Sequence, residues 1–321
     1  MKHRPAEYVD HRPAEPVKME MNALADQLIP APPFSLNLRG RLVEYTRPVV
    51  MGIVNLTADS FYGASRCAVG SQFTARIAQM LQAGADILDL GACSTRPGAA
   101  PVELRQEIEL LEPAVRQAKA LYPDCVVSVD TFRGEVARRA VEEWGADIIN
   151  DISGGKLDPE MLPTVERLKA PYILTHMRGT PQTMSRLTDY PEGVTAGVIS
   201  ELSPIVGRLT QAGVADIIID PGFGFAKTLE QNYILMRELP AIRRFFNRPV
   251  LVGISRKSMI YNLCGCTPED ALPGTTALNT FALMHGASIL RVHDVAAARQ
   301  TCAVVRQLYP PGCPEVPATH C

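Results

Sequence analysis

Residues Asp216 to Lys227 read DIIIDPGFGFAK, and this stretch decides how the rest of the chain is interpreted. Its three consecutive isoleucines, Ile217–Ile219, are typical of a parallel strand that is buried on both faces. Asp220 follows the strand directly, and a glycine-containing turn then leads to Lys227 and a helical pattern. Since glycines allow the backbone to approach a ligand closely, we expect a carboxylate at the carboxyl end of a strand, beside a loop suited to binding.

The same arrangement, in which a buried strand leads through a polar residue and a loop into a helix, repeats along most of the chain. Eight strands alternating with helices predict the α/β class and a (β/α)8 TIM barrel, whose chemistry lies at the carboxyl ends of the strands. An open doubly wound sheet is the alternative, but it requires a glycine fingerprint after the first strand, which this chain lacks. The strands are expected at Val49–Val54, Ile87–Leu90, Val126–Val129, Asp147–Asn150, Tyr172–Thr175, Ile217–Ile219, Val250–Ile254 and Ile289–Val292, and the helices include Glu103–Leu121, Gly134–Trp144 and Leu229–Leu239.

The two ends of the chain differ from this core. Residues 1–33 are rich in Pro, Glu and Arg and contain the pentapeptide HRPAE twice, which predicts a disordered N-terminal tail rather than a repeat fold. A short N-terminal hairpin is expected from Phe34 to Val43, with its turn at Arg39-Gly40, and a single barrel domain then covers residues 34–308. Residues 309–321 form a second tail that contains Pro and Cys.

Composition limits the classes of function. With 321 residues, 46% of them hydrophobic, the chain can bury the large core that a barrel needs. A net charge of -2 gives no reason to expect nucleic acid or a membrane surface as a partner, and no apolar run approaches the roughly 20 residues that span a bilayer. Because there is no secretory pattern and no CxxC pair, we expect a cytoplasmic protein with reduced thiols.

Polar residues follow the first four expected strands. Asn55 can bind a metal ion or a phosphate, although Asn also caps turns. After the second strand, Ser94-Thr95-Arg96-Pro97 offers hydroxyls and a guanidinium to a phosphate, or belongs to an ordinary surface loop. Asp130 and Asn150 offer hydrogen-bond acceptors and donors to a flat heterocycle, but each alone is equally well explained as a helix cap.

Basic residues follow the later strands. His176 can act as a base, but a lone His is more often structural. Arg256 and Lys257 precede a helix, where cations are disfavoured unless they bind an anionic or carbonyl ligand, the alternative being a solvated charge pair. Period-two alternation puts Arg291 and His293 on one side of the last strand, which suits a phosphate. Because caps do not explain polar residues at so many strand ends, we infer an enzyme acting on a phosphorylated or pyrophosphorylated small molecule with a polar ring.

Eight segments together resemble the dihydropteroate synthases, a family of the folate pathway. They occur in the family's order and span about residues 49–295, so the resemblance covers most of the chain. The form DSFY followed by GASR, with HMRGTPQTM, is similar to versions of the Bacteroides type. The segments are MGIVNLTADSF, DILDLGACSTRPGA, SVDTF, ADIINDISGG, HMRGTPQTM, IIIDPGFGFAKTLEQN, VGISRKSMI and ILRVHDV.

The resemblance implies a transferase that joins 6-hydroxymethyl-7,8-dihydropterin pyrophosphate to para-aminobenzoate, giving 7,8-dihydropteroate and pyrophosphate, with Mg2+ as cofactor. It also implies a homodimer and a target of sulfonamides. Pyrophosphate is expected to leave first, and the aryl amine then attacks the pterin cation. Charge stabilisation and exclusion of water therefore matter more than a general base.

The resemblance also assigns residues to each part of the substrates. Asp220 can accept hydrogen bonds from the 2-amino group and a ring N–H of a pterin, and Lys257 can donate to the ring carbonyl. The residues implied are, for the pterin, Asp130, Asn150, Asp220, Lys257 and Arg256; for the pyrophosphate, Asn55, Arg291 and His293; for Mg2+, Asn55; for para-aminobenzoate, Thr95, Arg96, Pro97, Ser255 and Phe225; and for catalysis, Asn55, Lys257 and Arg96.

Four positions depart from the family's usual pattern, and two other functions compete. The family usually has Pro at the position of Ala58, Asp near Gly63, Glu at the position of Cys93 and Met at the position of Thr175. The threonine makes that wall of the pterin site more polar.

A pterin methyltransferase that serves a corrinoid is the nearest enzymatic alternative, but it needs no pyrophosphate site. A catalytically silent pterin-binding module is the other, which the altered first loop favours and the retained anion-binding residues oppose.

Overall fold

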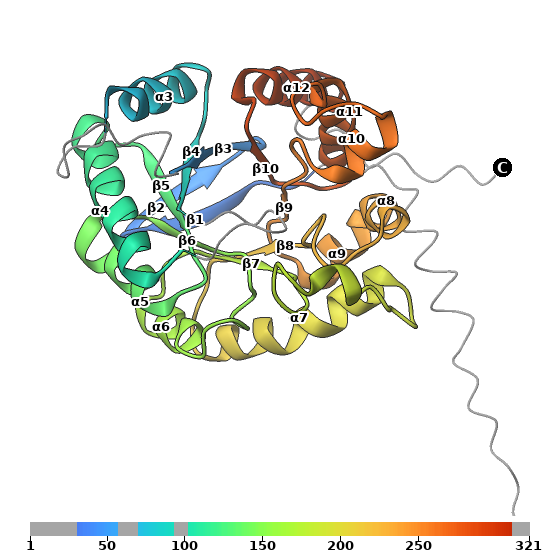
Figure 1. The fold of residues 1–321 in the computed structure, drawn as a ribbon, viewed down its shortest axis with the longest axis horizontal. Coiled ribbons are helices and arrows are strands. Elements are labelled where there is room, and N and C mark those ends of the chain that lie inside the picture. The colour runs from blue at the N-terminus through green and yellow to red at the C-terminus, as the bar shows by residue number, and fades with distance from the viewer. Residues whose placement is uncertain (1–30, 57–69, 93–101, 310–321) are drawn as a thin grey trace, which may run out of the picture.

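The computed structural model describes residues 31–56, 70–92 and 102–309, so nearly all of both predicted tails lies outside it. Its eight parallel strands have the order β8-β7-β6-β5-β4-β3-β10-β9. A parallel bridge between Ile219 and Val250 joins the two edges and closes the barrel, and the helices surround it (Figure 1). The strands are β3 (Val49–Asn55), β4 (Ile87–Gly91), β5 (Val126–Asp130), β6 (Ile148–Asp151), β7 (Tyr172–Thr175), β8 (Ile217–Asp220), β9 (Leu251–Val252) and β10 (Ile289–Val292).

The predicted barrel is confirmed, and seven of its strands end within one residue of the expected positions. The exception is β9, which is shorter than predicted because the carbonyl of Ile254 already accepts a hydrogen bond from the Lys257 amide in a turn. Within the described ranges, no helix is long and apolar enough to cross a membrane. The helices are α3 (Ser71–Gln82), α4 (Leu104–Leu121), α5 (Gly134–Arg139), η1 (Ala140–Trp144), α6 (Met161–Leu168), η2 (Met184–Arg186), α7 (Val194–Gln211), α8 (Leu229–Arg237), α9 (Leu239–Phe246), α10 (Ser258–Cys264), α11 (Leu272–Met284) and α12 (Val295–Leu308).

One predicted helix is divided, and another ends two residues earlier than expected. The segment Gly134–Trp144 changes from α-helix to a π-helical turn at Ala140. The segment Leu229–Leu239 ends at Arg237, and a new helix begins at Leu239 with Pro240 in its first turn. A proline has no amide hydrogen for the preceding helix but suits the start of the next, so the chain changes direction there.

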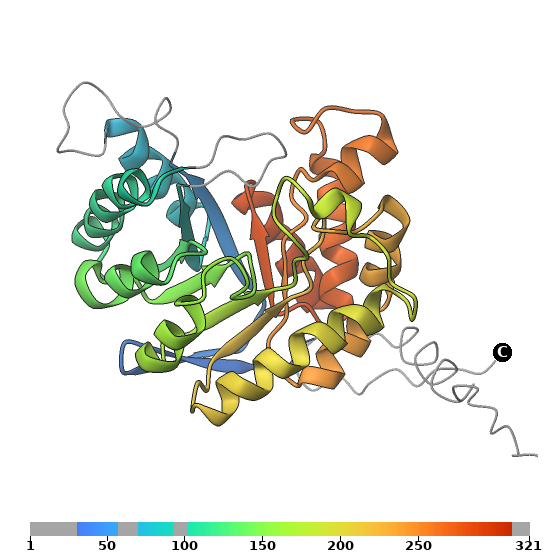
Figure 2. The same ribbon diagram turned by 60° about the horizontal axis from the view of Figure 1, so that its bottom comes forward.

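The N-terminal hairpin closes one end of the barrel. Alternation along the strands directs every second side chain into the barrel interior. At the amino-terminal end these side chains, among them Ile87, Val126 and Ile173, form one buried cluster with Leu36 and Leu38 of the hairpin. The hairpin consists of β1 (Phe34–Leu38) and β2 (Arg41–Tyr45), as predicted, and Figure 2 shows it in blue across the lower end of the barrel. The site must therefore be sought at the other end.

Shortening the side chain of Leu36, a buried hairpin residue at the closed end of the barrel, should destabilise the whole barrel. Leu36 is 1% exposed, so the Leu36→Ala substitution leaves a cavity and is expected to cost about 2–5 kcal/mol of unfolding free energy in urea denaturation. Leu42, in the same hairpin, is 74% exposed, and Leu42→Ala should cost less than about 0.5 kcal/mol. Equal effects of the two substitutions would mean that the hairpin does not contribute to the core.

Candidate active site

A cluster of charged side chains fills the carboxyl-terminal end of the barrel interior. Arg291 of β10 donates from Nε to Asp89 Oδ2 of β4 and from Nη2 to Asp130 Oδ2 of β5, both at 2.6 Å. Asn150 of β6 donates from Nδ2 to the same Asp89 oxygen at 3.1 Å. Four strands thus supply one polar cluster, in which the guanidinium of Arg291 pairs with two buried carboxylates.

The sharing of one cation sets the electrostatics of this cluster. Burial raises the pKa of Asp130 to about 7; Arg291 opposes this shift, and the neighbouring Asp89 adds to it. Burial also opposes the charge of Arg291, but Asp89 and Asp130 outweigh it and raise its pKa. The guanidinium therefore stays charged, whereas the ionisation of Asp130 near neutral pH depends on what else binds there.

Asp89 is the site residue that the sequence analysis did not single out. It interrupts an otherwise apolar strand, Ile87–Gly91, and its side chain is fully buried. A charged residue inside such a run was the available signal, because a buried carboxylate requires a partner.

Asp220, Lys257 and Phe225 lie together at this end of the barrel. Asp220 accepts a hydrogen bond from the Gly222 amide at 2.8 Å, and burial raises its pKa, while Lys257 lowers it. Lys257 donates to the carbonyl of Phe223, and its Nζ lies 4.4 Å from the centre of the Phe225 ring. Burial lowers the pKa of Lys257 to about 8, although Asp220 favours its charge. A carboxylate, an ammonium and an aromatic face therefore border one spot.

Gly222 allows this loop to lie directly against β7. Its φ is +72°, and a Cβ atom there would lie 1.9 Å from the carbonyl oxygen of His176. Gly222→Ala is therefore expected to lower the unfolding free energy by about 2–5 kcal/mol, through both the strained φ and the clash. Gly193→Ala is the matched control, because Gly193 has φ +94° but open space around it, so only the strain remains. If the two variants melt alike, the contact with His176 is unimportant.

The residues after β9 and β10 form a separate group. Ser255 Oγ lies 3.0 Å from His293 Nδ1, and Arg256 donates to both carboxylate oxygens of Asp294 at 3.1 and 2.7 Å. Burial, helped by Arg256 and Arg291, lowers the pKa of His293 to about 4, so its imidazole is neutral at neutral pH. Asn55 lies at the carboxyl end of β3 with an exposed side chain.

Three buried polar atoms in the interior have no hydrogen-bond partner among the described residues. They are Asp89 Oδ1, Ser128 Oγ and Thr175 Oγ1. In its strand, each of the three residues comes two positions after an apolar residue that points into the barrel: Ile87, Val126 and Ile173. Because side chains alternate along a strand, all three polar side chains also point into the barrel. Because a buried polar atom without a partner costs about 1–3 kcal/mol, their presence indicates a site built for a polar ligand.

Some predicted residues and features cannot be placed in this site. Thr95, Arg96 and Pro97, like Ala58, Gly63 and Cys93, lie outside the described residues. Across the described ranges, no group of three His, Cys, Asp or Glu side chains is arranged to hold a metal ion.

A cavity lies at the opposite end of the barrel and is lined by Arg47 and Arg299. Both guanidiniums already pair with Asp86.

Comparison with known proteins identifies the family. Residues 51–293 match the pterin binding enzymes. The chain is 44% identical over 267 residues to the dihydropteroate synthase of Synechocystis sp., covering 82% of this chain and 91% of that protein. Among solved structures, it resembles Yersinia pestis dihydropteroate synthase with a sulfonamide drug (TM-score 0.78, 35% identity, 86% of this chain and 99% of that one). It also resembles Xanthomonas albilineans dihydropteroate synthase in complex with 7,8-dihydropteroate (TM-score 0.73, 33% identity, 86% and 98%). The chain therefore belongs to the pterin binding enzymes and, among them, to the dihydropteroate synthases.

Proposed function

We propose that this chain condenses 6-hydroxymethyl-7,8-dihydropterin pyrophosphate with para-aminobenzoate to give 7,8-dihydropteroate and pyrophosphate. The observation that carries the proposal is the polar interior of the barrel mouth, where Asp130, Asn150 and Asp220 lie buried at the ends of β5, β6 and β8. A pterin presents a row of N–H donors and acceptors that such a group can satisfy. The Xanthomonas albilineans relative, whose structure holds 7,8-dihydropteroate, supports the same ligand class.

For the pterin, the assignment follows from charge and position. Asp220 would accept from the 2-amino group and a ring N–H, and Lys257 would donate to the ring carbonyl, with Asp130 and Asn150 completing the edge. Arg256, whose guanidinium pairs edge-on with Asp294, would cover the face of the ring. Donation to Asp130 favours its ionised form, so pterin binding should release a proton near pH 7.

For the pyrophosphate, we assign Asn55, Arg291 and His293. Mg2+ prefers oxygen ligands, keeps several waters and needs only one or two protein ligands beside substrate phosphates. The exposed amide of Asn55 at the end of β3 fits such a site. When bound, Mg2+ would neutralise charge on the departing pyrophosphate.

The reaction then needs positioning rather than a strong base. The bond between the pterin methylene carbon and the pyrophosphate oxygen breaks first, and its electron pair leaves with the pyrophosphate. The amine nitrogen of para-aminobenzoate attacks the resulting cation and afterwards loses a proton. Phe225 and Ser255 would hold the second substrate, while Thr95, Arg96 and Pro97 would close over it. Asn55, Arg96 and Lys257 would stabilise the charges that develop.

The test is an assay of both products with both substrates and Mg2+. The proposal predicts that dihydropteroate and pyrophosphate form in equal amounts. Binding of the pterin without turnover would instead favour a silent module, and methyl transfer from a folate would favour the corrinoid-linked alternative. We also retain a cytoplasmic homodimer as a prediction, and a solution mass of twice the 35.0 kDa chain would support the dimer.

A further inference from the structure

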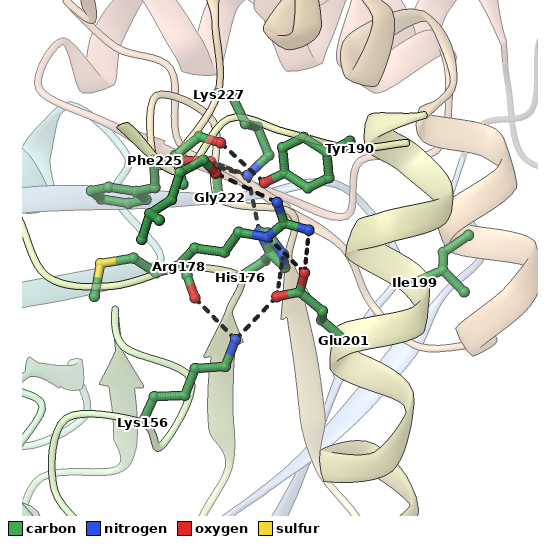
Figure 3. A network of polar contacts seen from close by, with 12 residues as sticks. Lys156, His176, Arg178, Tyr190, Ile199, Glu201, Gly222, Phe225 and Lys227 are labelled. Atoms are coloured by element: carbon green, nitrogen blue, oxygen red, sulfur yellow. Dashed lines mark hydrogen bonds and ion pairs between the residues drawn. The ribbon is translucent and has the colours of Figure 1, made fainter. Parts of the chain in front are cut away.

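Three titratable side chains from three elements lie in a row beneath the loop between β8 and α8 (Figure 3). Lys227 stands at the end of this loop, His176 directly after β7, and Glu201 in α7. Lys227 Nζ lies 3.0 Å from His176 Nδ1, and His176 Nε2 lies 3.3 Å from Glu201 Oε2. His176 is fully buried, and the reaction proposed above assigns no role to any of the three.

Lys227 fastens the loop that carries part of the pterin site. Its ammonium donates to the carbonyls of Gly222 at 2.9 Å and Phe225 at 3.0 Å, which lie at the beginning and towards the end of the turn. The hydroxyl of Tyr190 adds a bond to the Ala226 carbonyl at 3.0 Å. The loop thus depends on donors beneath it for its shape.

The hydrogen-bonding groups of Glu201, His176 and Lys227 determine which of their atoms carry protons. The Glu201 carboxylate only accepts, so the imidazole of His176 carries its proton on Nε2, which faces that carboxylate. The contact is not aligned as a hydrogen bond, so Glu201 acts on the imidazole chiefly through its charge. Nδ1 then presents a lone pair to Lys227. Because two carbonyls already take two of its hydrogens, only a charged Lys227 has a third to give.

We propose that Glu201 and His176 are positioning residues of the pterin site, which hold Lys227 as an ammonium so that it fixes the β8–α8 loop. In this shape the loop presents Phe225 and the Phe223 carbonyl to Lys257, next to Asp220. The inference rests on the proposed function, because its main readout is pterin binding.

The electrostatics of the row agree with this assignment. Burial lowers the pKa of His176 to about 4, which leaves the imidazole neutral, and contacts with His176 and Arg178 lower the pKa of Glu201. Burial lowers the pKa of Lys227 to about 7, and Asp220 and Glu201 favour its charge, whereas Lys257 and Arg178 oppose it. Asp220 first and Glu201 second are therefore the carboxylates that favour the charge of Lys227 against its burial.

The test compares Lys227→Met and Glu201→Gln with Lys156→Met as the matched control. Methionine fills the space of Lys227 without its donors, so a mere packing role predicts no change. Lys156 also pairs with Glu201, at 3.2 Å, but its Nζ donates to the Met177 carbonyl and not to the Gly222 and Phe225 carbonyls that Lys227 holds. By calorimetry with 6-hydroxymethylpterin, Kd is expected to rise at least about tenfold in Lys227→Met and about threefold in Glu201→Gln, but less than about twofold in the control.

Hydrogen exchange in the unliganded protein gives a second readout. Amides of residues 222–227 should exchange at least about tenfold faster in Lys227→Met, while those of the β1–β2 hairpin stay unchanged. Wild-type affinity and exchange in Lys227→Met would overturn the proposal. Should that variant fail to fold, unchanged affinity and loop exchange in Glu201→Gln would overturn it instead. If the wild-type protein binds no pterin, the proposed function fails, and loop exchange alone decides whether the row fixes the loop.

Discussion

Replacing Arg291 by Met is expected to lower the unfolding free energy by about 3–5 kcal/mol at neutral pH and to abolish turnover. The substitution removes the guanidinium that Asp89 and Asp130 share and leaves two buried carboxylates without a cation. In addition, the departing pyrophosphate loses one of its assigned partners. Any residual activity should show a KM for the dihydropterin pyrophosphate that rises far more than the KM for para-aminobenzoate.

The loss of stability should depend on pH in a defined direction. Arg291 lowers the pKa of Asp130, so without it burial and the neighbouring Asp89 hold the folded-state pKa of Asp130 further above the value of about 3.9 that Asp has in an unfolded chain. The folded protein then binds more protons than the unfolded one, so its stability falls as pH rises through that range. Urea denaturation should therefore show a smaller difference from wild type at about pH 4.5 than at about pH 7.5.

Two further variants make this result specific. Adding Asp130→Asn to Arg291→Met removes one of the unpaired charges and should restore part of the stability, but not the activity. Arg306→Met, on the exposed side of α12, should change the unfolding free energy by less than about 0.5 kcal/mol. If Arg291→Met were as stable as wild type, the buried ion cluster would not exist as described.

Lys257→Met is expected to weaken pterin binding more than it weakens the fold. It removes the ammonium assigned to the ring carbonyl, a charged hydrogen bond that contributes about 1.5–3 kcal/mol, or roughly 10- to 150-fold in Kd. It also removes the cation that favours the ionised form of Asp220. Calorimetry with 6-hydroxymethylpterin measures the effect, and urea denaturation serves as the control for folding. Near-normal affinity would mean that the pterin lies elsewhere.

The strands were predictable because their sequences carry the signature of burial on both faces. Ile217–Ile219 is apolar at every position, and Asp220 marks the point where the chain emerges at the mouth. Burial on both faces is also why Asp89 was not predicted as a site residue. The sequence of such a strand does not show which of its residues point into the barrel. Only the register of β4 with β5 shows that Asp89 and Ser128 lie side by side there.

The row beneath the β8–α8 loop could not be derived from spacing. Glu201 is 25 positions from His176 in sequence and belongs to a helix whose other residues give no sign of a site. His176 was open to two interpretations, and its contacts with Lys227 and Glu201 favour the structural one. The end of α8 near Pro240, by contrast, had a local signal, and the predicted helix Leu229–Leu239 stopped directly before that proline.

A crystal structure of the protein with bound 6-hydroxymethylpterin would test the central claim most directly. We expect the ring inside the barrel mouth, with its 2-amino group within about 3.2 Å of the Asp220 carboxylate and its carbonyl at a similar distance from Lys257 Nζ. A pterin bound at the opposite end, for example in the cavity lined by Arg47 and Arg299, would contradict the assignment. So would a ring inside the barrel that contacts neither Asp220 nor Lys257.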